Sequence, residues 1–195
     1  MNPGDVILTR SDTWISRAIR NFTSKPGEPA LVSHAGIFLC SKHVLEALFS
    51  GVKTTRFPQD FVGLEFVIYS PTNINVCQRE LLEAKAATFS ARRYGYMKIV
   101  AQALDWATGT RFFTSKVFTW DRYPYCSFVV AESYKLIDKD FAVPTKSTTP
   151  DDILDFVVSH PDKYRLVEGT PALIEDIARV YSSDKDKGNC EEIGG

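Results

Sequence analysis

Residues 32–49 read VSHAGIFLCSKHVLEALF. Two β-rich runs, Val32–Leu39 and Val44–Phe49, stand on either side of the polar segment Cys40–His43. Two runs of this kind, separated by a short polar segment, are typical of a β-hairpin. The sequence therefore predicts an antiparallel pair of strands here.

The register of this hairpin decides where Glu46 lies. Opposed residues of an antiparallel pair have a constant index sum and share one face of the sheet. A three-residue loop places Glu46 opposite Gly36 and diagonal to His34, about 7–8 Å away between Cα atoms, with the small Gly36 leaving room for the Glu46 side chain. A two-residue loop turns Glu46 to the other face. The sequence leaves both registers open.

Shorter patterns on both sides of the hairpin predict further elements. Residues 4–9, 63–69 and 164–167 are β-rich, whereas apolar residues recur at helical spacing over 14–22, 78–93, 97–107, 126–137, 150–159 and 172–181. Ser11, Asp12 or Thr13 could cap the first helix, and Thr149 followed by Pro150 is a strong helix start. The mixture predicts an α+β fold, as one domain over residues 1–181 with a flexible polar tail over 182–195.

The composition of the chain limits the classes of function that we expect. Lys and Arg number 23 and Asp and Glu 24, for a net charge of -1, so a nucleic acid is not the expected partner. No apolar run approaches the ~18 residues of a membrane span, and the N-terminus lacks a signal-peptide pattern, so we expect a soluble cytoplasmic protein. No zinc-ligand spacing occurs, and neither a metal nor another cofactor is expected. The few candidate ligands are Cys40, Cys77, Cys126, Cys190, His34, His43 and His160.

Cys126 is the first candidate for chemistry. It follows Pro124 and stands where an apolar helix begins. A helix N-terminus favours the thiolate over the thiol, and the N–H groups of the first turn can stabilise a developing oxyanion. The alternative interpretation is a buried cysteine that acts as a small hydrophobic residue.

His34 and Glu46 are the second and third candidates. His34 interrupts an apolar strand, and an imidazole there is either part of a site or a core histidine bound to a backbone carbonyl. Glu46 interrupts the apolar run of the second hairpin strand, where an acid could equally face solvent. His43 and His160 lie at segment boundaries and are more simply surface residues.

Four segments in this order resemble a known family. They are residues 3–8 (PGDVIL), 33–38 (SHAGIF), 44–47 (VLEA) with Gly51-Val52, and 125–130 (YCSFVV). The set is similar to the permuted papain-like amidases (the YiiX/YaeF-like group), circularly permuted relatives of NlpC-type cell-wall peptidases. In that group the histidine strand precedes the cysteine helix, as it does here. The resemblance covers about residues 3–137.

The resemblance implies a permuted papain-like fold, with an antiparallel sheet or barrel packed against helices. It also implies that Cys126 is the nucleophile, His34 the general base and Glu46 the group that orients His34. Tyr94 and Tyr125 are the expected substrate-binding residues, although Tyr96 and Tyr123 compete with them.

The implied activity is that of a thiol hydrolase. It would cleave an amide bond, in a peptidoglycan-type peptide or an N-acyl amino acid, through an acyl-enzyme. Two alternatives stay open. One is a lipid acyltransferase or thioesterase that uses the same site, which an apolar groove lined by Phe112, Phe113 and Trp120 would favour. The other is a binding module that kept the fold without the activity.

Overall fold

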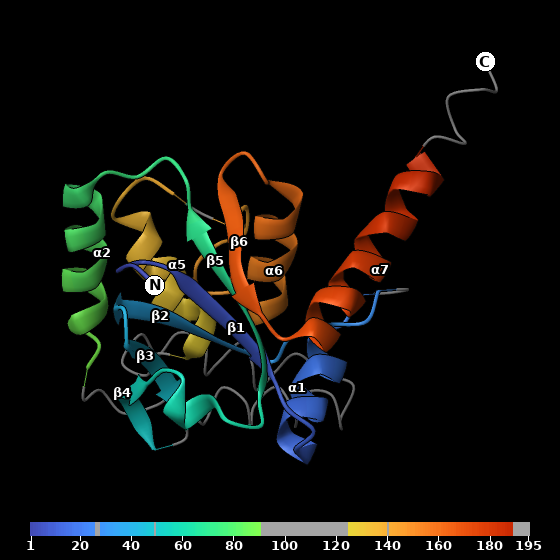
Figure 1. Cartoon of the computed structure of the whole chain (residues 1–195), viewed down its shortest axis with the longest axis horizontal. Coiled ribbons are helices and arrows are strands. Elements are labelled where there is room, and N and C mark those ends of the chain that lie inside the picture. Colours follow the sequence, from blue (N-terminus) through green and yellow to red (C-terminus); the bar gives the residue numbers. More distant parts are fainter. Residues whose placement is uncertain (26–27, 49, 91–124, 140, 189–195) are drawn as a thin grey trace.

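The fold is an antiparallel sheet packed against helices, and it is seen in a computed structural model that describes residues 1–25, 28–48, 50–90, 125–139 and 141–188 (Figure 1). In this part of the chain the sheet has six strands, in the order β4-β3-β2-β1-β5-β6, and every neighbouring pair is antiparallel. The strands are β1 (Val6–Arg10), β2 (His34–Cys40), β3 (His43–Leu48), β4 (Gly51–Arg56), β5 (Glu65–Pro71) and β6 (Tyr164–Gly169). The mixed α+β class predicted from the sequence is therefore confirmed.

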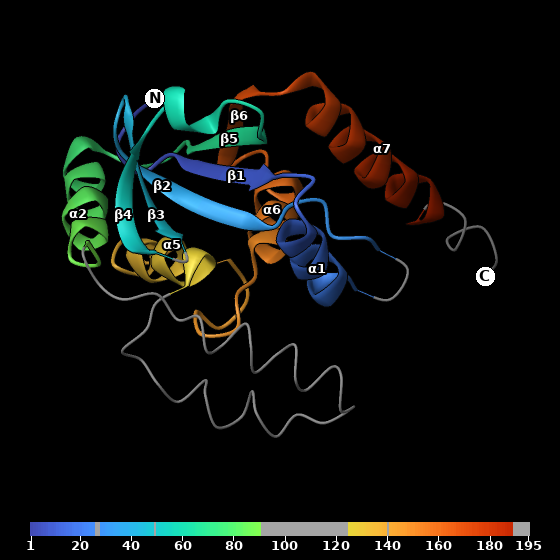
Figure 2. The ribbon, with the colours of Figure 1, turned by 90° about the horizontal axis from the view of Figure 1, so that it is seen from below.

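The helices cover the sheet unevenly. They are α1 (Trp14–Thr23), a short 3-10 helix η1 (Gln59–Phe61), α2 (Val76–Ala87), α5 (Cys126–Lys135), α6 (Pro150–Ser159) and α7 (Pro171–Gly188). Helices α2 and α5 pack against β2 and against each other, on one face of the sheet (Figure 2). In the described residues, none of the helices combines the length and the apolar character that crossing a membrane requires.

Alternation along the strands divides the core between the two faces. On the α5 side the main cluster contains Leu8, Ile37 and Leu45, together with helix residues such as Val129. On the other face a smaller cluster includes Ile7, Phe38, Val44, Phe57, Phe61 and Ile68. Successive side chains of a strand point to opposite faces, so one short strand can serve both clusters.

The hairpin register combines the two alternatives that the sequence left open. Cys40 pairs with His43, so the turn has two residues, and the three-residue loop is wrong. A bulge between Phe38 and Cys40 then shifts the pairing, and Glu46 lies opposite Gly36 as the three-residue loop would have placed it. The extra residue of a bulge changes the register just as an extra loop residue would. A β-carbon at Gly36 would lie 3.1 Å from Glu46 Cγ, so the lack of a side chain at Gly36 leaves room for the Glu46 side chain.

Helix starts follow the expected caps. The Thr13 side chain accepts a hydrogen bond from the Ser16 N–H, and Thr149 and Asp152 form a capping box at α6. Helix α2 begins at Val76 because Asn75 and Gln78 form a second capping box, which the sequence analysis missed.

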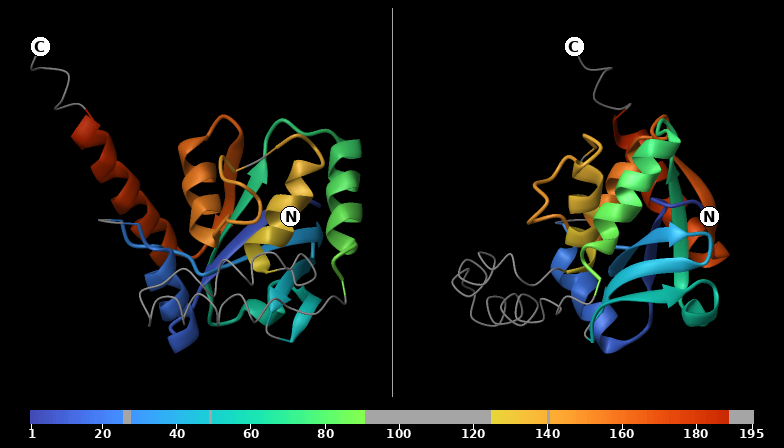
Figure 3. Two further views of the ribbon diagram at one scale, coloured as in Figure 1. Left: turned by 180° about the vertical axis from the view of Figure 1, so that it is seen from behind. Right: turned by 90° about the vertical axis from the view of Figure 1, so that its left-hand side faces the viewer.

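Other boundaries differ from the predictions. The predicted helix over 78–93 ends at Ala87, because the N–H groups of residues 88–90 bond three residues back and tighten the last turn. Strand β4 was missed because VKTTR is polar, as suits an edge strand. Helix α7 continues to Gly188, past the predicted boundary at 181, and leads away from the sheet (Figure 3). The helix predicted over 97–107 lies outside the described residues.

Candidate active site

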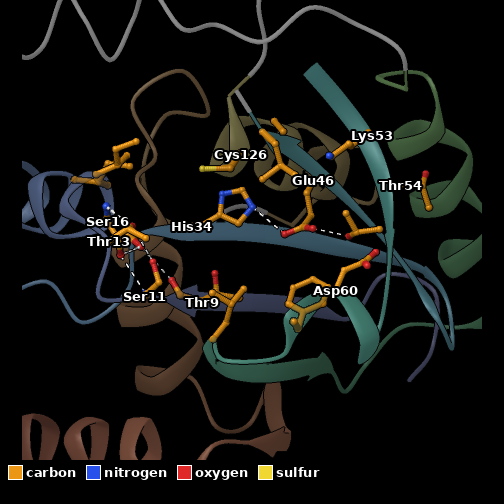
Figure 4. A pocket seen from close by; sticks show the side chains of 18 residues that line it. Thr9, Ser11, Thr13, Ser16, His34, Glu46, Lys53, Thr54, Asp60 and Cys126 are labelled. Atoms are coloured by element: carbon orange, nitrogen blue, oxygen red, sulfur yellow. Dashed lines mark hydrogen bonds and ion pairs between the residues drawn. The ribbon is translucent and has the colours of Figure 1, made fainter. Parts of the chain in front are cut away.

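Three residues far apart in the sequence meet at one end of β2. His34 is the first residue of β2, Glu46 lies in the middle of β3, and Cys126 is the first residue of α5. Helix α5 packs against both strands and so brings its first residue to the start of β2. Figure 4 shows the Cys126 sulfur on one side of the His34 ring and the Glu46 carboxylate on the other. The structure thus brings together the three residues that the sequence singled out.

Glu46 holds the imidazole ring from β3. His34 Nε2 and Glu46 Oε1 are 2.9 Å apart, and Glu46 is only 5% exposed. Its second oxygen accepts a hydrogen bond from the Thr55 hydroxyl of β4. Burial by itself would raise the pKa of Glu46, but the hydrogen bonds and the positive charge of His34 lower it. The carboxylate is therefore ionised, and it fixes the orientation of the ring.

Cys126 is placed to carry a negative charge. The His34 ring and the N–H groups of Ala35 and Ser127 each lower the pKa of its thiol. The pairing of β2 with β3 ends at Gly36 and Glu46, one residue short of Ala35. Because Glu46 takes Nε2, Nδ1 is the ring nitrogen that remains for the thiol. The sulfur therefore lies between an imidazole and two backbone donors.

Electrostatics favour the ion pair of thiolate and imidazolium. Burial raises the pKa of the Cys126 thiol, but the charge and hydrogen bond of His34 and the two N–H groups lower it below the usual thiol range. Burial likewise disfavours the charged His34 ring, but the thiolate and the Glu46 carboxylate raise its pKa to about 10. Each member stabilises the charged form of the other, which is how a low-pKa cysteine becomes a nucleophile at neutral pH.

The start of α5 is built to keep the first turn open. Its cap residue, Tyr125, has extended backbone (φ -114°, ψ 168°) and no side-chain hydrogen bond to the helix. The first-turn N–H groups are thus left without a side-chain cap, and the Ser127 N–H helps to lower the pKa of the Cys126 thiol. The Ser127 hydroxyl donates to the Thr148 carbonyl and anchors the helix start to the loop before α6.

The three residues open onto a cavity of about 620 Å³. Its wall includes one group of hydroxyl side chains, from the end of β1, the start of α1 and the segment before β2 (Figure 4). Apolar and charged residues complete it. The lining residues are Thr9, Ser11, Thr13, Ile15, Ser16, Ile19, Ser33, His34, Glu46, Ala47, Leu48, Lys53, Thr54, Thr55, Asp60, Phe61, Leu64 and Cys126. A substrate in this cavity would reach the sulfur and the ring together.

The structure describes one of the two tyrosines that were predicted to bind substrate. Tyr94 lies outside the described residues. The Tyr125 ring packs against Phe128, with ring centroids 5.7 Å apart, and its hydroxyl donates to the carbonyl groups of Thr145 and Lys146. Tyr125 is absent from the described lining of the cavity, and its role in substrate binding stays a prediction.

Sequence reasoning missed Thr55 and the Ala35 N–H group. Thr55 pairs with Val44 and is therefore the diagonal neighbour of Glu46. Reading Gly51 as the start of a strand would have revealed it, since β3 and β4 form a second hairpin. No local signal marks the Ala35 N–H, because its role depends on where α5 docks.

Comparisons with known proteins found no relative of this chain. No family model matches the sequence, and neither the curated proteins nor the solved structures contain a match. Within the described residues, no three His, Cys, Asp or Glu side chains are grouped so as to hold a metal ion.

Proposed function

We propose that this chain is a thiol hydrolase that cleaves amide bonds through an acyl-enzyme on Cys126. The observation that carries the proposal is the His34 ring, held between the Cys126 sulfur and the Glu46 carboxylate at the wall of a cavity. A nucleophile, a base and an orienting carboxylate in this order are the arrangement that acyl transfer requires. The resemblance to the permuted papain-like amidases supports the same reaction and, as part of the proposal, the same fold.

The first half of the proposed reaction forms the acyl-enzyme. The thiolate attacks the carbonyl carbon of the amide, and the carbonyl electrons move to oxygen. N–H groups at the start of α5 stabilise the oxyanion. The carbonyl then re-forms, the carbon–nitrogen bond breaks, and the His34 imidazolium gives its proton to the departing amine. A thioester on Cys126 remains, and His34 is neutral.

The second half releases the acid. Neutral His34 accepts a proton from a water molecule as the oxygen attacks the thioester, and the carbon–sulfur bond breaks. The thiolate and the imidazolium are restored, and the product is a carboxylic acid. Glu46 stabilises the imidazolium at both stages and keeps the ring in place.

The decisive experiment follows the acyl group. The purified chain is incubated with aminomethylcoumarin amides of N-acetylated amino acids and with p-nitrophenyl acetate, and trapped adducts are located by mass spectrometry. We expect an adduct on Cys126, and we expect neither an adduct nor turnover in Cys126→Ala.

The matched control is Cys77→Ala, which removes an exposed thiol on α2 and should leave both readouts unchanged. Full turnover by Cys126→Ala would refute the thiol mechanism. A chain that forms no adduct with any of these acyl donors would instead be the binding module that keeps the fold without the reaction.

A further inference from the structure

A second hydroxyl-bearing residue stands beside the His34 ring. Thr9 of β1 lies directly opposite His34 in the pairing of β1 with β2. Opposed residues of an antiparallel pair have Cβ atoms about 4.5–5.5 Å apart and point to the same face. Thr9 is also part of the cavity wall (Figure 4). The ring therefore has Glu46 on its β3 side and Thr9 on its β1 side.

Thr9 is only 4% exposed, but its hydroxyl is not sealed in the core: it lies at the cavity wall, and no group among the described residues hydrogen-bonds to it. The Thr9 carbonyl is used, since it accepts from the N–H and the hydroxyl of Ser33. A substrate that fills the cavity would exclude water from this hydroxyl, and a buried hydroxyl that makes no hydrogen bond is unfavourable. A ligand that supplies the missing partner is therefore favoured over one that leaves it unpaired.

The neighbouring hydroxyls of the wall are already paired. Ser11 Oγ and Thr13 Oγ1 are 3.0 Å apart, and Ser16 Oγ and Ser33 Oγ are 2.6 Å apart. The Ser11 N–H also donates to Ser16 Oγ, at 3.1 Å. These pairs fix a polar wall next to Thr9, whose hydroxyl the described residues leave open to the cavity.

We propose that Thr9 is a specificity-determining residue that hydrogen-bonds a polar group of the substrate beside His34. The inference rests on the proposed hydrolase function and narrows its substrate class. A threonine hydroxyl can donate to a carbonyl or carboxylate oxygen and accept from an amide N–H. An acyl amino acid or peptide supplies such groups within one residue of the scissile bond. A plain alkyl chain supplies none and leaves the hydroxyl unpaired.

Two acyl donors of equal chain length test the proposal. N-acetylglycine p-nitrophenyl ester carries an amide where pentanoic acid p-nitrophenyl ester carries methylene groups. The rate of acylation of Cys126 is measured from the release of p-nitrophenolate and checked by the mass of the adduct. We expect the wild-type chain to react faster with the N-acetylglycyl ester, after correction for the rates of both esters with free cysteine.

Thr9→Val keeps the shape of the side chain and removes the hydroxyl. We expect it to slow acylation by the N-acetylglycyl ester about tenfold, the size of one net hydrogen bond, and to leave the pentanoyl rate unchanged. Thr9→Ser should retain the wild-type preference. Thr72→Val is the matched control, because Thr72 is an exposed threonine outside the described lining of the cavity, and it should change neither rate.

The outcomes separate the two proposals. Absence of a Cys126 adduct with either ester in the wild-type chain would overturn the hydrolase function itself. Acylation of Cys126 with no preference between the esters, or with equal rate changes for both esters in Thr9→Val, would overturn only the role of Thr9. Thermal unfolding of each variant shows whether the fold is kept.

Discussion

Replacing His34 by Gln removes the positive charge beside Cys126 and keeps a side chain that can hydrogen-bond. In the wild-type protein, burial raises the pKa of the Cys126 thiol, and the charge and hydrogen bond of His34, together with the N–H groups of Ala35 and Ser127, more than offset this. Without the imidazolium the effect of burial remains. The pKa of the thiol in His34→Gln should therefore reach that of an ordinary thiol, ~8.5, or exceed it.

The size of the effect follows from the ionised fraction. A thiol with a pKa of ~8.5 is about 0.3% ionised at about pH 6 and loses thiolate about tenfold for each further pH unit. In the wild-type chain the thiolate persists to lower pH, and His34, with its pKa raised to about 10, stays protonated through the neutral range. A less basic thiolate is a weaker nucleophile, by roughly threefold for each tenfold fall in basicity. The two rate profiles should therefore cross, with the wild type faster at low pH and the variant faster at high pH.

Alkylation by iodoacetamide measures these profiles. Labelling of Cys126 is quantified by peptide mass spectrometry between about pH 5 and about pH 9, a range that spans the ordinary thiol pKa. Exposed Cys77 in the same sample reports on the reagent. Thermal unfolding shows that His34→Gln is folded under the labelling conditions.

Profiles of the same shape in both proteins would refute the reasoning, because the thiol would then titrate without sensing the ring. The crossing is a stronger criterion than the absolute rate. A low pKa increases the amount of thiolate and reduces its nucleophilicity, so the two effects partly cancel at any single pH.

Two further predictions concern the supports of the site. In Gly36→Ala the new β-carbon would meet Val44 Cγ1 at 2.8 Å and Glu46 Cγ at 3.1 Å, so we expect a loss of about 1–3 kcal/mol in thermal unfolding and slower Cys126 alkylation at low pH. An unchanged melting temperature would contradict the predicted overlap. Burial raises the pKa of Asp151 to about 6, above its value in the unfolded chain. The protonated carboxyl group therefore contributes fully to the free energy of unfolding below about pH 4, and this contribution is lost as the pH rises through about 6. Asp151→Asn keeps an oxygen acceptor for the Leu31 N–H and does not titrate. In denaturant unfolding, the free energy of unfolding of the wild type should therefore fall by roughly 2–3 kcal/mol relative to that of the variant between about pH 4 and about pH 7. Parallel stability curves for the two proteins would contradict this.

Local sequence patterns predict some parts of the site and not others. The helix start at Cys126 and the strand that carries His34 could both be predicted, because capping, apolar spacing and β-rich runs are properties of a few neighbouring residues. The side of the sheet on which Glu46 lies could not. It depends on a single bulge residue near the turn, and a change of one residue in register moves every side chain of a strand to the other face.

The α+β class, the hairpin, most capped helices and the residue types able to carry thiol chemistry could be predicted from local sequence patterns. The packing of distant elements was needed to show that Cys126, His34 and Glu46 meet, that Thr55 and the Ala35 N–H support them, and that Thr9 lines the same cavity. The physical reason is that local elements form from neighbouring residues. Contacts between positions as distant as 34 and 126 instead depend on how α5 and the sheet bury their apolar faces together.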